Sequence, residues 1–119
     1  MDIESFRSYC LAKPGTSEDL PFGPDTLTIR VMGKIFAFAG LDSVPLSVSL
    51  KTDPELAIDL RERYDAIRGA YHLNKKHWSS VRMDGSVPMN VITTMIDASY
   101  ALVVGGLKKS EREQLALIT

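Results

Sequence analysis

Cysteine is almost absent from this chain of 119 residues: Cys10 is the only one, so no internal disulfide can form. Such cysteine usage is typical of a reducing compartment. Long apolar runs are also missing, since no stretch reaches the roughly 18 apolar residues that a membrane span requires. The N-terminal segment has no apolar centre of the kind found in signal peptides. We therefore expect a cytoplasmic protein with no membrane partner.

The chain also lacks an excess of charge of either sign. It has 14 lysines and arginines against 15 aspartates and glutamates, which gives a formal net charge of -1. Nucleic-acid-binding proteins usually carry a basic excess, because neutralisation of phosphates drives their affinity. A nearly neutral chain can hold a polyanion only if its cations gather on one face.

The length and composition indicate one globular domain over residues 1–119. Hydrophobic residues make up 45% of the chain and charged residues 24%, which are ordinary values for a folded domain. A chain of this size can form a core without support from a metal or a disulfide.

Hydrophobic periodicity predicts an α+β fold. Apolar residues alternate with polar ones over 27–32 and 44–51, as in strands with one wet face. In contrast, 16–25 indicates an ordered loop. The first half is expected to hold a helix over 3–10 and strands over 27–32, 35–39 and 44–51. A helix that begins at Asp53 and fades near Gly69 follows, and then a strand over 78–83. A long helix from Ser86 is expected to end in a left-handed cap at Gly105-Gly106, and a final helix is capped by Ser110. Short connections favour an antiparallel sheet with the helices packed on one face, which leaves the opposite face for function.

The segment Tyr71–Trp78 reads Tyr-His-Leu-Asn-Lys-Lys-His-Trp. This segment resembles a motif of the MmcQ/YjbR family, and five further blocks resemble family motifs in the same order: Pro21-Phe22-Gly23, Gly33–Ala37, Leu50–Glu55, Asp84-Gly85 and Ser99-Tyr100. The resemblance covers nearly the whole chain. It implies a fold similar to that of CyaY and frataxin, and a DNA-binding role through a double-wing motif. Gly69-Ala70 departs from the Pro-Gly often found before the Tyr-His pair.

The basic segment that ends in Trp78 is the main candidate for a binding site. Arg82 shares the side of Trp78 on an ideal strand, while Lys34 lies at a hairpin tip and Lys51 in a neighbouring strand. Cations of this kind follow phosphates, and an indole ring stacks on an unpaired base for roughly 1–3 kcal/mol. The predicted DNA-binding or ligand-binding residues are Lys34, Lys51, His72, Asn74, Lys75, Lys76, His77, Trp78 and Arg82.

The same residues fit other interpretations. They could line a cleft for a small anionic molecule or a peptide terminus, or contact a protein partner. They could also be structural, with solvated lysines, a buried Trp78, a turn held by Asn74 and a helix end capped by His72.

No pattern in the sequence predicts a metal site, a cofactor or an enzyme. His72 and His77 are five residues apart, a spacing that separates them on a helix and on a strand alike. Ser79 and Ser80 lie near His77, but no glycine-flanked turn presents either hydroxyl as a nucleophile. Asp84 beside Gly85 is typical of a turn.

Overall fold

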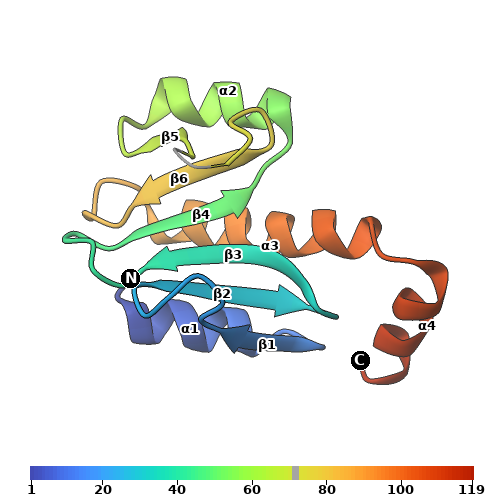
Figure 1. Ribbon diagram of the computed structural model, residues 1–119. Helices are drawn as coiled ribbons and strands as arrows, with labels where there is room; N and C mark the ends of the chain where they lie inside the picture. Colours follow the sequence, from blue (N-terminus) through green and yellow to red (C-terminus); the bar gives the residue numbers. More distant parts are fainter. Residues whose placement is uncertain (71–72) are drawn as a thin grey trace.

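The computed structural model describes residues 1–70 and 73–119. In this part of the chain four helices and six strands occur (Figure 1). None of these helices combines the length and apolar character needed to cross a membrane. In chain order the elements are α1 (Ile3–Leu11), β1 (Thr16–Asp19), β2 (Thr26–Val31), β3 (Lys34–Gly40), β4 (Ser47–Lys51), α2 (Pro54–Arg63), β5 (Ile67–Gly69), β6 (Trp78–Arg82), α3 (Met89–Gly105) and α4 (Lys109–Leu117).

The six strands form one antiparallel sheet in the order β1-β2-β3-β4-β6-β5. Figure 1 shows α1 and α3 behind this sheet, α2 beside β5, and α4 beyond the end of the β2–β3 hairpin. The expected α+β architecture, with the helices on one face, is therefore confirmed. The opposite face carries no helix of the described residues, and this open face is available for a ligand or partner.

The long helix α3 supplies much of the core. Its apolar stripe recurs at three- and four-residue steps, so one side of the helix faces β3 and β4. All five positions expected in this stripe are buried: Ile92, Met95, Ile96, Ser99 and Val103.

Ser99 is the polar member of that stripe, and it bridges two strands. Its hydroxyl donates to the carbonyl oxygen of Phe36 at 2.6 Å and accepts from the backbone N–H of Lys51 at 2.9 Å. Phe36 is the extra residue of a bulge in β3, because Ile29 pairs with Ala37 and Arg30 with Ile35. The Ser99 side chain thus completes the β3–β4 ladder where direct pairing stops.

The segment 16–25 contains an edge strand, so the expectation of a loop there is wrong for β1. β1 is polar throughout, and side chains rather than an apolar pattern hold it in place. The guanidinium of Arg7 in α1 binds Glu18, with Nε 2.8 Å from Oε2, and Thr28 of β2 donates a hydrogen bond to Asp19. Charged side chains on an exposed edge also discourage pairing with another chain.

The end of α2 and the start of β4 also differ from expectation, and the strand β5 was not expected. Helix α2 ends at Arg63, because Tyr64 is extended, and the short strand β5 follows where the helix was expected to fade. Strand β4 begins at Ser47 rather than Val44, since Pro45 has no N–H to give to a ladder. These differences matter for function because β5 brings another row of side chains to the open face.

The two C-terminal caps also differ from expectation. Gly106 follows α3 with φ -92°, which is not left-handed, so the predicted left-handed cap is wrong. Helix α4 begins at Lys109, and the backbone N–H of Lys108 donates to the Glu111 side chain at 3.0 Å. The expected cap at Ser110 therefore lies inside the helix.

Cys10 is completely buried on the inner side of α1. Burial raises the pKa of its thiol to about 12, because the interior disfavours the thiolate. The thiol is therefore protonated at neutral pH.

Candidate binding site on the open sheet face

Cross-strand pairing determines which side chains share the open face. Phe38 of β3 lies opposite Ser49 of β4, and Ser49 lies opposite Ser80 of β6. Lys51 lies directly opposite Trp78. Because paired residues of an antiparallel sheet point to the same face, these five side chains lie on one surface. The prediction that Arg82 lies on the Trp78 side of its strand, and that Lys51 points to the wet side of its own strand, agrees with this register.

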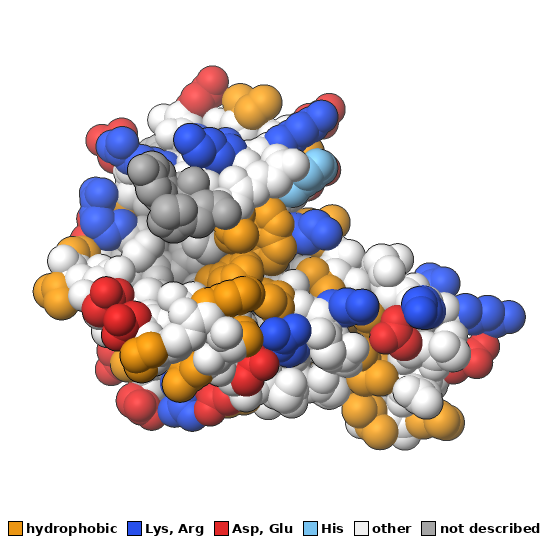
Figure 2. Space-filling view, in the orientation of Figure 1, with side chains coloured by type: hydrophobic (Ala, Val, Ile, Leu, Met, Phe, Trp, Pro, Cys, Tyr) orange, Lys and Arg blue, Asp and Glu red, His pale blue; other side chains and the backbone are white. Residues whose placement is uncertain are grey.

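Three aromatic side chains form a row across this face, here called the aromatic row. The Phe38 ring lies 5.4 Å from the Trp78 ring in an edge-on arrangement, and 6.3 Å from the Phe22 ring, which stacks on it. Trp78 is half-buried, whereas Phe22 is 65% exposed. Phe22 reaches Phe38 from the β1–β2 loop, where Gly23 has φ +107°. Apolar side chains also gather at the centre of the face in Figure 2.

A cleft of about 620 Å³ adjoins the aromatic row, here called the central cleft. This volume lies within the range of small-molecule sites, and aromatic rings with a few hydroxyls are the usual lining of such sites. Its lining residues are Phe22, Thr26, Phe38, Ala39, Gly40, Ser43, Ser47, Ser49, Ala70, Leu73 and Ser80.

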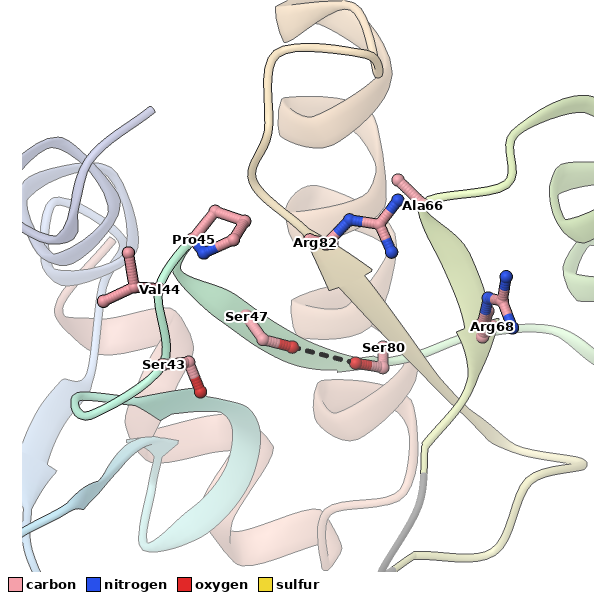
Figure 3. A pocket seen from close by; sticks show the side chains of 8 residues that line it. All are labelled: Ser43, Val44, Pro45, Ser47, Ala66, Arg68, Ser80 and Arg82. Carbon is pink, nitrogen blue, oxygen red and sulfur yellow. Dashed lines mark hydrogen bonds between the residues drawn. The ribbon is translucent and has the colours of Figure 1, made fainter.

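A second hollow of about 410 Å³, here called the arginine pocket, lies further along the face (Figure 3). Its polar lining comes from two arginines, Arg68 and Arg82, and from serines that also line the central cleft. The hydroxyls of Ser47 and Ser80 are 3.0 Å apart and form a hydrogen bond. Because Ser43, Ser47 and Ser80 line both hollows, the central cleft and the arginine pocket adjoin each other.

The loop that precedes β6 is held by Asn74. The Asn74 side-chain oxygen accepts from the backbone N–H of Lys76 at 2.9 Å. The backbone carbonyl oxygen of Asn74 accepts hydrogen bonds from the N–H groups of His77 and Trp78 at 3.1 and 2.9 Å. Asn74 therefore has the turn-forming role that the sequence left open, and its side chain is occupied within the loop.

Arg61, which the sequence analysis did not select, attaches this loop to α2. Its Nη2 lies 2.6 Å from the Lys75 carbonyl oxygen, 3.1 Å from that of Trp78 and 3.1 Å from the Ser79 hydroxyl. No sequence signal marked Arg61, because it stands among ordinary helix charges. It is a positioning residue for the loop that carries the predicted cations.

Lys75 lies toward α2 rather than toward the aromatic row. A Cβ atom at Gly69 would lie 3.0 Å from Cβ of Lys75, so the lysine stem fills that space. Gly69 lies opposite Ser79, whose buried side chain faces the helices. The structure therefore separates Lys75 from Lys51 and Trp78 by the thickness of the sheet.

Three further predicted residues, Lys34, Lys76 and His77, lie near the end of the face that carries Trp78. Lys34 begins β3 at the hairpin tip, near the end that carries Lys51 and Trp78, and Lys76 and His77 directly precede β6. Lys34, Lys51, Lys75 and Lys76 have no carboxylate within 4.0 Å in the part of the chain that is described. His72 lies outside the described residues.

Arg82 lies four residues from Trp78, or about 13 Å along the strand. Its Nε pairs with Asp84 at 2.8 Å. Hydrogen bonds from Ser86 and the Arg82 guanidinium lower the pKa of Asp84 well below its ordinary value. Arg82 therefore belongs to the arginine pocket and not to the end of the face that carries Lys34, Lys51 and Trp78.

Within 1–70 and 73–119, no three histidine, cysteine, aspartate or glutamate residues gather in a way that could hold a metal ion. The hydroxyls of Ser79 and Ser80 form hydrogen bonds with other hydroxyls: Ser79 with Thr52 at 2.8 Å, and Ser80 with Ser47. The polar groups of the face are thus arranged as hydrogen-bonding and ion-pairing groups.

Sequence comparison places this face within a known family. The family model named YjbR matches residues 11–102. The chain belongs to the MmcQ/YjbR family. Its relatives in Escherichia coli include YjbR of strain K12, which is 39% identical over 115 residues, or 97% of this chain and 98% of the relative. YbdF of strain O157:H7 is 33% identical over 113 residues, or 94% and 92% of the two chains.

Solved structures of similar proteins share the MmcQ/YjbR fold. The Deinococcus radiodurans protein DR2400, which carries the DUF419 domain, is 37% identical with a TM-score of 0.91, over 96% of this chain and 87% of that one. A Pseudomonas syringae protein is 29% identical with a TM-score of 0.74, over 86% and 98% of the two chains. The YjbR match includes the aromatic row and the arginine pocket but leaves out α4 and most of α1.

Proposed function

We propose that this MmcQ/YjbR protein is a non-catalytic binding module, and that its central cleft takes a small anionic molecule with a flat apolar group. The observation that carries the proposal is that an aromatic-lined cleft adjoins a pocket that bears two arginines, with three serines lining both. Phe22 and Phe38 offer ring faces, the serines offer hydroxyl donors, and the arginines offer charge. We place this binding in the cytoplasm, which agrees with the single buried thiol.

Charge distribution favours a small ligand over a duplex. In Figure 2 lysine and arginine side chains lie around the border of the face, and apolar side chains lie at its centre, where the rings of Phe22, Phe38 and Trp78 meet. A phosphate backbone would require cations in a continuous track, whereas a compact ligand needs one apolar surface and one charged group.

Replacing Phe38 by alanine tests the proposal. We expect 8-anilinonaphthalene-1-sulfonate, which has flat rings and one negative charge, to bind with fluorescence enhancement. Loss of the Phe38 ring should weaken this binding by about 5- to 10-fold, since aromatic contacts contribute on the order of 1 kcal/mol beyond their buried area. Trp78 is the only tryptophan, so energy transfer from it reports the location of the dye.

Ile58→Ala serves as the matched control, because Ile58 is a 60% exposed apolar residue of α2 that does not line the central cleft. Circular dichroism should show both variants folded. Equal dye affinity in the two variants, or an absence of energy transfer from Trp78, would contradict binding in the central cleft.

A second candidate is single-stranded nucleic acid, and one observation favours it. Lys34, Lys51 and Lys76, which have no carboxylate partner in the described chain, lie near the Trp78 end of the face. For this function we expect affinity on the order of 10⁻⁴–10⁻⁶ M that falls steeply between about 50 and 200 mM salt. The joint replacement of Lys51 and Lys76 by alanine should lower the salt slope by about two if both contact phosphate, because Lys51 lies opposite Trp78 and Lys76 lies in the loop before it. Fluorescence anisotropy of a labelled oligonucleotide measures the affinity and its salt slope. No binding at the lowest salt would exclude this candidate.

A further inference from the structure

We propose that the arginine pocket is a carboxylate subsite, in which Arg68 and Arg82 together hold the acid group of a ligand whose apolar tail lies in the central cleft. This inference rests on the proposed function and specifies its ligand class: monocarboxylic acids with an aromatic or aliphatic tail.

The two guanidinium groups are positioned by their inner nitrogens. Nε of Arg82 lies 2.8 Å from a carboxylate oxygen of Asp84, and Nε of Arg68 donates to the carbonyl oxygen of Asp65 at 3.1 Å. Within the described chain, no hydrogen bond involves the terminal Nη groups of either arginine. These outer groups form the fork that binds carboxylates in a bidentate way. Figure 3 shows both guanidinium groups at the border of the pocket.

Strand register brings the two arginines within reach of one ligand. Arg68 lies opposite Ser80, two residues before Arg82, and the N–H of Arg82 donates to the carbonyl oxygen of Ala66 at 2.9 Å. Arg68 and Arg82 are therefore diagonal neighbours on one face, about 7–8 Å apart at their backbones. A carboxylate between them would also relieve the repulsion of two like charges.

The local charge favours a monoanion. Asp84 remains ionised beside Arg82, because hydrogen bonds from Ser86 and the guanidinium lower its pKa. One of the two arginine charges is thereby balanced, and the pocket offers about one net positive charge. A carboxylate matches that charge, whereas a phosphate dianion would exceed it.

The aromatic row sets the length of the ligand. Phe38, Ser49, Ser80 and Arg68 are paired in succession across β3, β4, β6 and β5. Three strand spacings separate the ends of this line, or about 14 Å. The floor between them carries serine hydroxyls, including the Ser47–Ser80 pair, over which a hydrocarbon chain with one acid end can lie.

Isothermal titration with 6-phenylhexanoate and with 6-phenylhexan-1-ol tests the inference, since the two differ only in the acid group. We expect the acid to bind about 10-fold more tightly than the alcohol at low salt, because exposed ion pairs contribute modestly and two are formed. In the double variant R68Q/R82Q the acid should lose this advantage while the alcohol binds as before. R63Q is the matched control, since Arg63 is an exposed arginine of α2 that pairs with Asp59.

Each outcome separates the subsite from the function. Equal binding of acid and alcohol, or an R68Q/R82Q variant that binds the acid as tightly as R63Q does, overturns the carboxylate subsite and leaves the cleft in place. Failure of both compounds to bind overturns the subsite, and the anilinonaphthalenesulfonate result with Phe38→Ala then decides the proposed function separately. Inorganic phosphate that competes more strongly than acetate would overturn the assignment to carboxylates.

Discussion

Replacement of Ser99 by alanine is expected to lower the free energy of unfolding by about 2–4 kcal/mol, because two backbone groups lose their partner at once. The carbonyl of Phe36 accepts a hydrogen bond from the Ser99 hydroxyl at 2.6 Å, and the N–H of Lys51 donates to the same hydroxyl at 2.9 Å. Phe36 is fully buried, so water cannot replace the lost donor without entering the core. Urea unfolding followed by circular dichroism measures the change.

Amide hydrogen exchange gives a sharper readout at the same site. We expect the N–H of Lys51 to exchange faster in the Ser99→Ala variant, whereas amides in the middle of β3 and β4 change less. Thr94→Ala is the control in the same helix: Thr94 is exposed, and its loss should change stability by less than about 0.5 kcal/mol. If Ser99→Ala keeps both stability and Lys51 protection, β3 and β4 can pair directly there and the bridge is dispensable.

Replacement of Arg61 by methionine is expected to cost about 1–3 kcal/mol and to loosen the loop before β6, since hydrogen bonds to a charged donor are lost. The Lys75 carbonyl loses the contact of 2.6 Å. The Trp78 carbonyl keeps its bond from Ala70 N–H at 3.1 Å, and Ser79 keeps Thr52, which limits the loss. Methionine preserves the packing of the side-chain stem, so the change isolates the guanidinium.

Trp78 fluorescence measures the effect on the loop, because this residue begins the strand that the loop enters. We expect a red shift in the Arg61→Met variant as the indole gains contact with water. Arg63→Met is the control, since Arg63 has a 62% exposed side chain and pairs only with Asp59 in the described chain, at 3.4 Å. An unchanged emission spectrum together with unchanged stability would show that the turn formed by Asn74 holds the loop without Arg61.

Elements with a strong apolar period were predictable from the sequence. The stripe of α3 was correct at every position, and the alternation in β4 and β6 put Lys51, Trp78 and Arg82 on the wet side of their strands. In each of these elements one side is buried, so apolar residues recur with the period of that helix or strand and can be recognised within the element's own sequence. The missed strands give no such signal: β1 is entirely polar, and β5 has only three residues.

The candidate site depended on non-local pairing, which periodicity does not encode. The pairing of β6 with β4 places Trp78 opposite Lys51, and β5 on the far side of β6 adds Arg68. Phe22 joined the aromatic row through a loop whose path no pattern indicated. Conversely, Lys75 was grouped with Trp78 because they are close in sequence, and the structure sends them to opposite sides of the sheet.

The buried thiol of Cys10 has a practical consequence for experiments on the open face. Maleimide and iodoacetamide reagents attack thiolates, and a fully buried thiol with its pKa raised to about 12 offers almost none at neutral pH. A second cysteine introduced at an exposed position, such as Lys34 or Val44, would then be the reactive one. A variant with one such introduced cysteine can therefore carry a single site-specific dye at either end of the open face, with Cys10 left in place.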